Sequence, residues 1–257
     1  MAGDGFFHTF FIEPLYNGLV FLMDILPWPD AGLAIIFLTL LVKLLLFPLS
    51  KKSIKTQIKM REIDPELKAL REKYKNDKQK QAAATMALYK ERGVNPFSGF
   101  LLILIQIPII IALYQIFLKN GLPVIETGIL YSFVPAPENV SISFLGLIDI
   151  TKKSLFLALL AGVSQFFQTR FSIPAMKQQP KKSDATFQES LAWSMNVQMR
   201  YVFPLVAFFI SWSISGAIAL YWTTSNIFAI VQELVVRRKI ILAESKSPQN
   251  QQAKHGK

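Results

Sequence analysis

The chain has 257 residues, of which 52% are apolar, and its 28 Lys and Arg against 17 Asp and Glu give a formal net charge of +11. Strong basicity together with high apolar content is unusual for a soluble domain and is typical of a membrane protein whose charges lie in loops. The chain has no cysteine, which excludes disulfides, thiolate metal sites and Cys nucleophiles. Because its two histidines, His8 and His255, are far apart, we expect neither a metal nor a cofactor.

The N-terminal segment has large apolar side chains at helical spacing between Phe6 and Leu26, roughly opposite Glu13, Asn17 and Asp24. The pattern predicts an amphipathic helix in residues 1–29 that lies in the membrane interface. A spanning helix in the same segment is the alternative. The first thirty residues contain no Lys or Arg, so we expect no signal peptide and place the protein in a bacterial plasma membrane.

Five apolar stretches are expected to cross the bilayer as helices. They are residues 30–50, 96–118, 154–171, 201–214 and 217–236. The fourth spans only roughly 20 Å of a hydrocarbon core of about 30 Å, so it must thin the bilayer or lean on its neighbours. The predicted fold class is therefore an all-α polytopic membrane protein with a five-helix transmembrane core, an N-terminal interfacial helix and a cytoplasmic helical hairpin.

The distribution of Lys and Arg predicts the orientation of these spans. Residues 1–42 carry none, residues 50–95 carry thirteen, and residues 119–153 carry three. By the positive-inside rule the segments 51–95, 172–200 and 237–257 are cytoplasmic, and the loop 119–153 is extracytoplasmic. We therefore expect the N-terminus outside and the C-terminus, with its basic tail, in the cytoplasm.

The segment 51–95 has the periodicity of two helices. Asp64-Pro65 fits a helix start and Gly93 fits a helix end. The segment is expected to be a basic helical hairpin, and the alternative is a solvated loop that only sets topology. Apolar residues step by three to five within each half: Ile54, Ile58, Ile63, Leu67, Leu70 and Tyr74 in the first, and Ala82, Met86 and Tyr89 in the second.

Lys43 is the first Lys or Arg of the chain and lies in the apolar run L-A-I-I-F-L-T-L-L-V-K-L-L-L-F-P-L of residues 33–49. A Lys at the centre of a spanning helix costs roughly 2.5–3.5 kcal/mol. Such charges usually face a bundle interior or a watery cavity and mark function. The alternative is that Lys43 snorkels toward the surface near Lys51 and Lys52.

Other polar side chains occupy the predicted spans. Thr39 lies four residues before Lys43 and therefore on the same helix face. Gln106, Gln165 and Trp222 lie in the second, third and fifth spans. Each could form one interhelical hydrogen bond, but together with an unpaired Lys43 they indicate a wet cavity. Because no carboxylate lies at comparable depth, Lys43 is a candidate site for a visiting anion.

No motif of an enzyme is present: the chain has no Walker A loop, no H-E-x-x-H and no G-x-S-x-G. Glu233 stands four residues before Arg237, which favours an ion pair on one helix face over catalysis. We therefore expect no catalytic residues and no enzymatic activity.

Four stretches together resemble the YidC/Oxa/Alb family of membrane protein insertases, and the resemblance covers nearly the whole chain. They are L-T-L-L-V-K-L-L-L-F-P-L-S-K at 38–51, M-A-L-Y-K-E-R-G-V-N-P-F-S-G at 86–99, L-I-Q-I-P-I-I-I-A-L-Y at 104–114 and S-G-A-I-A-L-Y-W-T-T-S-N at 215–226.

The resemblance implies five core helices around a hydrophilic groove that is open to the cytoplasm and to lipid and closed outside. It places Lys43 where the family usually has Arg, with Thr39 beside it, Gln165 nearby and Trp222 at a groove-facing aromatic position. Lys keeps the positive charge but lacks the two-pronged guanidinium that binds a carboxylate.

The implied function is that of an insertase that moves nascent hydrophobic segments and short acidic tails into and across the membrane. The implied partners are nascent membrane proteins, the ribosome and signal-recognition targeting machinery, and the Sec translocon. Charge alone would equally suit anionic lipids. Two alternatives remain: a membrane chaperone or scaffold without insertion activity, and an anion-selective small-solute transporter. The transporter would usually have an internal repeat, which is not evident.

Overall fold

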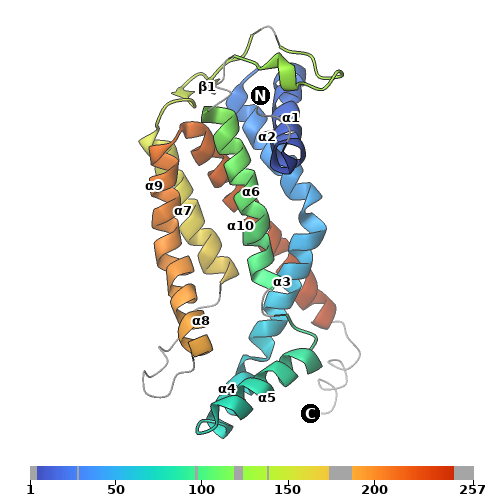
Figure 1. Cartoon of the computed structure of the whole chain (residues 1–257), viewed down its shortest axis with the longest axis vertical. Helices are drawn as coiled ribbons and strands as arrows, with labels where there is room; N and C mark the ends of the chain where they lie inside the picture. Colours follow the sequence, from blue (N-terminus) through green and yellow to red (C-terminus); the bar gives the residue numbers. More distant parts are fainter. Residues whose placement is uncertain are drawn as a thin grey trace.

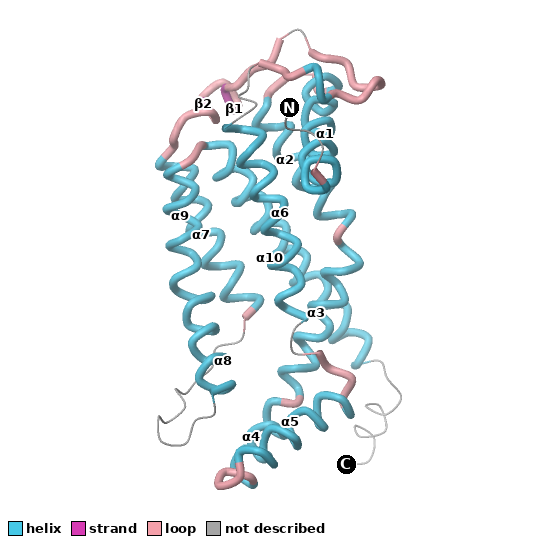
Figure 2. The backbone as a smooth tube through the Cα atoms, viewed as in Figure 1, coloured by secondary structure: helices cyan, strands magenta, loops and turns pink. Residues whose placement is uncertain are grey.

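The computed structural model describes residues 5–27, 29–95, 98–118, 124–137, 139–173 and 187–245, which are mostly helical (Figure 1). The long helices lie side by side, with an irregular loop region over one end and a short helical hairpin at the other (Figures 1 and 2). Parts of several predicted segments lie outside the described residues: 1–4, 28, 96–97, 119–123, 138, 174–186 and 246–257.

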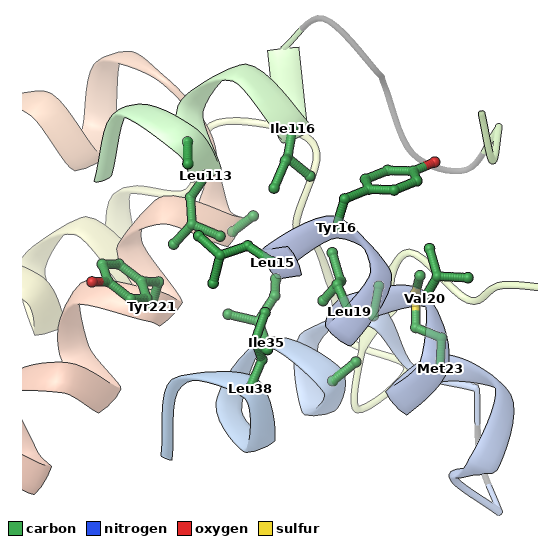
Figure 3. Close-up of a cluster of buried hydrophobic side chains, with 14 of the residues drawn as sticks. Leu15, Tyr16, Leu19, Val20, Met23, Ile35, Leu38, Leu113, Ile116 and Tyr221 are labelled. Carbon is green, nitrogen blue, oxygen red and sulfur yellow. The ribbon is translucent and has the colours of Figure 1, made fainter. Parts of the chain in front are cut away.

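The N-terminal region is a π-helical turn, η1 (His8–Ile12), that continues into α1 (Glu13–Ile25). Pro14 follows the π-helical turn directly, in the first turn of α1. Because proline has no N–H to donate within a helix, a local change in the hydrogen-bond pattern is expected at this place. Helix α1 buries Tyr16, Leu19 and Met23 completely, against α2 (Ala31–Leu45) and α6 (Ser98–Leu118). Figure 3 shows Leu15 of the same helix among Ile35 of α2, Leu113 of α6 and Tyr221 of α10 (Gly216–Ser245). The amphipathic helix is thus part of the main apolar core.

The first predicted span is bent. Asp30 caps α2, because its Oδ1 accepts from the N–H groups of Gly32 at 2.7 Å and Leu33 at 3.1 Å. Helix α2 ends at Leu45, and α3 (Phe47–Glu62) begins with Pro48 in its first turn. The axes of α2 and α3 differ by 63°. Proline inside a continuous helix would remove one hydrogen bond and clash with the preceding turn, which accounts for a bend at this place.

None of the described helices is by itself long and apolar enough to cross a membrane, whereas α2 and α3 meet the criterion only as a bent pair.

A helical hairpin follows α3. Helices α4 (Asp64–Lys73) and α5 (Lys78–Glu91) pack together around Ile63, Leu67, Leu88 and Val94. Asp77 caps α5 by accepting from the N–H of Lys80 at 3.0 Å. The chain leaves α5 through Gly93, whose φ of +61° suits a residue without a Cβ.

The remaining helices form a bundle. Helix α7 (Leu155–Ser172) packs against both α9 (Phe203–Ser213) and α10, and α10 also contacts α2, α3 and α6. Before α9 the chain forms α8 (Phe187–Val197) and the π-helical turn η3 (Gln198–Val202). Residues 214–215 alone connect α9 to α10, so these two helices are adjacent and antiparallel (Figure 1). A second apolar cluster fills the space between α7, α9 and α10.

The loop region between α6 and α7 forms a compact cover. It holds a short 3₁₀ turn, η2 (Thr127–Ile129), and an antiparallel pair of two-residue strands, β1 (Ser143–Phe144) and β2 (Ile148–Asp149), in the register Ser143 to Asp149. Backbone bonds tie the cover to α10, since the N–H of Ala217 donates to Ile150 O at 2.9 Å. It also lies directly on α2: a Cβ added to Gly32 would come within 2.5 Å of the Phe144 ring.

Candidate functional site

Lys43 lies in the last turn of α2, half-buried. Its Nζ donates to Oε1 of Gln106 on α6 at 3.1 Å, and Nε2 of Gln106 donates to the hydroxyl of Tyr221 on α10. The structure therefore brings together two of the predicted residues, Lys43 and Gln106. Tyr221 is a third member, which was not among the predicted site residues although it opens a polar and aromatic block over residues 221–226.

Among the residues that the structure describes, the positive charge of Lys43 has no counter-ion. In the part of the chain that the structure describes, no carboxylate forms an ion pair with Lys43, and its hydrogen-bond acceptor is a neutral amide. An amide oxygen is a weaker acceptor for an ammonium than a carboxylate. An incoming carboxylate could therefore replace Gln106 at the Nζ with a gain in electrostatic attraction.

Thr39 lies one helical turn before Lys43 but has a different environment. It is 2% exposed, and its hydroxyl donates to the carbonyl of Ile35 at 2.6 Å within the same helix. It faces a cavity of about 10 Å³ whose lining is otherwise mostly apolar: Leu15, Ile35, Leu38, Val42, Ile109, Leu113 and Tyr221. A volume this small holds about one water molecule at most.

Gln165 and Trp222 form a separate pair. The indole Nε1 of Trp222 donates to Oε1 of Gln165 at 2.7 Å, and the two residues are only 5% and 4% exposed. Trp222 belongs to the cluster between α7, α9 and α10, whereas Tyr221 joins the cluster of α1, α2 and α6. Consecutive residues of a helix point about 100° apart, so α10 presents one aromatic side chain to each side.

The surfaces of the long helices are apolar. A cavity of about 330 Å³ between α2 and α10 is lined by Ile36, Leu40, Thr224, Ile227, Phe228 and Val231. Large apolar side chains are also exposed on α2, α6, α7, α9 and α10, among them Leu44, Leu104, Phe156, Leu205, Phe209 and Ile227. Exposed apolar area on this scale is expected where lipid or another apolar surface covers it.

Helical architecture, apolar helix surfaces and a cation held between helices are features of polytopic membrane proteins. The chain belongs to the 60Kd inner membrane protein family, whose model matches residues 22–244.

Several relatives, among them the three that follow, bear the name membrane protein insertase YidC. The protein of Clostridium tetani is 35% identical over 207 residues, which cover 80% of this chain and 81% of the relative. That of Fusobacterium nucleatum is 31% identical over 211 residues, or 81% of this chain and 86% of the relative. That of Alcanivorax borkumensis is 35% identical over 209 residues, which make up 81% of this chain but 31% of the relative. The resemblance inferred from four sequence segments is confirmed.

Proposed function

We propose that the protein is a membrane protein insertase of the bacterial plasma membrane. In this proposal it moves nascent hydrophobic segments, and the short acidic tails attached to them, into and across the bilayer. The observation that carries it is Lys43, a cation between helices whose only side-chain hydrogen-bond partner among the described residues is the neutral Gln106. Family membership and the names of the relatives support the same conclusion.

The first step is electrostatic. A carboxylate of the client tail approaches Lys43 through a hydrophilic groove and takes the place of the Gln106 oxygen. Two unit charges 4 Å apart attract by roughly 4 kcal/mol at an effective dielectric constant near 20, before desolvation is counted. Gln106 keeps its hydrogen bond to Tyr221 and so remains in place between α6 and α10.

The second step is partitioning. The hydrophobic segment of the client leaves along the apolar helix surfaces into lipid, which draws the tail outward. A membrane potential that is positive outside helps by about 2.3 kcal/mol per charge per 100 mV. No covalent bond is broken in either step, so the proposal needs no catalytic residue and no cofactor.

The other predicted contact residues are assigned to the groove wall. Thr39 lies one turn from Lys43 on α2, and Gln165 and Trp222 join α7 to α10. Because all three are buried in the described conformation, we propose that a client meets Lys43 and Gln106 first. It would reach Trp222 only where α7, α9 and α10 move apart.

Location and partners follow from the charge distribution. We propose that α3 to α5 and the C-terminal tail lie in the cytoplasm and that the loop between α6 and α7 lies outside. The basic hairpin is then available to the ribosome, the targeting machinery or anionic lipid. The Sec translocon is a further proposed partner.

The test is insertion of a single-spanning client with an acidic N-terminal tail into proteoliposomes that contain the purified protein. Lys43→Ala and Lys43→Glu should reduce tail translocation about tenfold or more, since 1.4 kcal/mol corresponds to a factor of ten, while Lys43→Arg should preserve it. Lys153→Ala is the matched control, because it also removes one lysine charge, but from an exposed residue that lies just before α7 and outside the site. Equal insertion by all variants would exclude Lys43 as the working group.

The same proteoliposomes separate the alternatives. A chaperone or scaffold would improve folding of an already inserted client and would tolerate Lys43→Ala. A small-solute transporter would release entrapped anions in the absence of any client. Either result without tail translocation would contradict the proposed function.

A further inference from the structure

The interface between α7 and α10 contains a continuous series of side-chain hydrogen bonds, which we call the seam: Trp222, Gln165, Gln168, Ser172 and Glu233. Trp222 donates to Gln165 at 2.7 Å, Gln165 Nε2 donates to Gln168 Oε1 at 3.0 Å, and Gln168 Nε2 donates to Ser172 Oγ at 3.2 Å. The hydroxyl of Ser172 then donates to Oε2 of Glu233. The seam begins on α10 at Trp222, follows α7 and returns to α10 at Glu233. At 1.5 Å per residue, these two ends lie about 16 Å apart along α10.

The chemistry of the two ends fixes the direction of every bond in the seam. An indole N–H can only donate, and an ionised carboxylate can only accept. Ser172 must therefore give its single proton to Glu233 and accept from Gln168, whose own oxygen is then free to accept from Gln165. A series with one direction strengthens each of its bonds, and it allows only one orientation for both amides.

Glu233 is itself held firmly at the other end. It is 2% exposed, and Arg237 donates to its Oε1. Arg237 also donates to the carbonyl of Phe171 at 2.8 Å, and Arg61 of α3 donates to the carbonyls of Phe171 at 3.2 Å and Ser172 at 3.3 Å. The carboxylate therefore stands at a point where α3, α7 and α10 meet, and its position is set by several independent contacts.

We propose that Glu233 is a positioning residue that acts through Ser172, Gln168 and Gln165 on the indole of Trp222. By accepting from Ser172 it fixes the orientation of both glutamines and holds α7 and α10 in one register, so that Trp222 keeps a defined place in the wall between them. The functional part of this inference rests on the proposed insertase activity, in which that wall borders the path of the client.

The first readout reports Trp222 directly. In a variant with Trp28, Trp193 and Trp212 changed to Phe, the ultraviolet resonance Raman band of the remaining indole reports the strength of its N–H hydrogen bond. Ser172→Ala breaks the seam while Trp222 and Glu233, the residues at its two ends, stay unchanged. It should shift this band toward the position of a more weakly hydrogen-bonded indole N–H. Ser172→Thr keeps the hydroxyl and should restore the original position.

A matched control distinguishes an effect of the seam on the Trp222 band from an effect of weaker contact between α7 and α10 in general. Ser164 accepts from Nδ2 of Asn226 at 3.1 Å, which is another hydrogen bond between α7 and α10 but not part of the seam. Ser164→Ala should therefore leave the Trp222 band unchanged. If it shifts the band as much as Ser172→Ala does, or if Ser172→Ala has no effect, the proposal is wrong.

The role of Glu233 is tested without leaving the partly buried Arg237 unpaired. The double variant Glu233→Leu, Arg237→Leu removes both partners of the ion pair and takes away the acceptor of Ser172. It should shift the Trp222 band in the same direction as Ser172→Ala. An unchanged band in a folded double variant would overturn the assignment to Glu233.

Client insertion provides the second readout, on the otherwise native chain. Ser172→Ala should reduce insertion roughly two- to tenfold, the range expected for one lost polar interaction, and Ser172→Thr should restore it. The two proposals can fail separately. If the Raman band behaves as expected while Lys43→Ala inserts normally, the insertase mechanism fails and the positioning role stands. If the Lys43 variants behave as expected and the band does not move, only the positioning role fails.

Discussion

The two ends of the molecule are held together by different kinds of contact. At the end that carries the cover, buried side chains bind backbone groups of the loop: Nδ2 of Asn17 donates to Ile129 O at 2.9 Å, its Oδ1 accepts from Tyr131 N at 2.6 Å, and Tyr16 Oη accepts from Glu126 N at 2.7 Å. At the hairpin end, most ion pairs join exposed side chains, such as Arg92 with Glu66 at 2.8 Å.

This difference has a mechanical consequence. A side chain that binds backbone groups in a buried place cannot be replaced by water without leaving those groups unsatisfied. Exposed ion pairs are weak, are screened by salt and exchange readily with other charged partners. The covered end is therefore held more firmly than the hairpin end.

The largest effect that we expect is from Asn17→Leu. Asn17 is 2% exposed and joins α1 to the carbonyl of Ile129 and the N–H of Tyr131. Two backbone groups would lose their partner, at a cost of about 2–4 kcal/mol in the free energy of unfolding. Chemical unfolding followed by circular dichroism would measure the loss. Asn139→Leu, at an exposed loop position, should cost far less, and equal losses would contradict the comparison.

A smaller effect is expected from Asp30→Asn. Both carboxylate oxygens of Asp30 accept from backbone: Oδ1 from the first turn of α2, and Oδ2 from Leu145 N at 2.7 Å. The amide retains one acceptor oxygen, so one of these contacts is lost, at a cost of about 1–2 kcal/mol. Hydrogen exchange at the Leu145 amide should speed up accordingly. Asp24→Asn, on an exposed part of α1, serves as the control and should leave that amide unchanged.

At the hairpin end, Arg92→Gln should have a still smaller effect. It removes the bond of Arg92 to both oxygens of Glu66, but both side chains are nearly half exposed. The expected loss is at most about 1 kcal/mol, and it should disappear at high salt. Hydrogen exchange of α4 and α5 at low and high salt measures it. A large loss that salt does not change would show that the hairpin is held as firmly as the cover.

The smallest effect concerns the pH dependence of α5. Two hydrogen bonds to the carboxylate of Asp77 lower its pKa below the ordinary value of 3.8. The larger contribution comes from the backbone N–H of Lys80 and the next from the side chain of Lys80. The stabilisation from this cap is therefore complete above that ordinary value and is lost as the pH falls through the lower pKa of the folded state. Exchange of the Lys80 amide, compared with that of an α4 amide, should rise only in this acidic range. Asp77→Asn keeps an acceptor but does not titrate, so a rise that persists in this variant would assign the pH dependence to another group.

Local features of the sequence were predicted well. Helical periodicity and long apolar stretches predicted a mostly helical protein, and four segments indicated the family. The ion pair of Glu233 with Arg237 is confirmed, because residues four apart on a helix are neighbours whatever the tertiary structure. The bend between Leu45 and Phe47 was not predicted, although Pro48 was the signal that could have indicated it.

Contacts between distant segments were not predictable in the same way. The sequence placed Lys43, Gln106, Gln165 and Trp222 inside apolar segments but could not say which of them meet. In the structure Lys43 meets Gln106, 63 positions away, and Trp222 meets Gln165, 57 positions away. Among the described residues, the hydroxyl of Thr39, on the same helix face as Lys43, bonds only to the backbone of its own helix.

The sequence by itself determined the mostly helical character of the chain, the family and the lone charge in an apolar run, since these depend on composition and on spacing along one helix. Helix α8, inside the predicted loop 172–200, and the short strands β1 and β2 were not predicted. Only the tertiary structure decided that Tyr221 and Trp222 serve two different polar groups and that a seam runs from Trp222 to Glu233. The physical reason is that the periodicity of a helix fixes which residues share a face. The rotation of that helix against its neighbours, which selects the partner of each polar group, is set by the packing of the whole bundle.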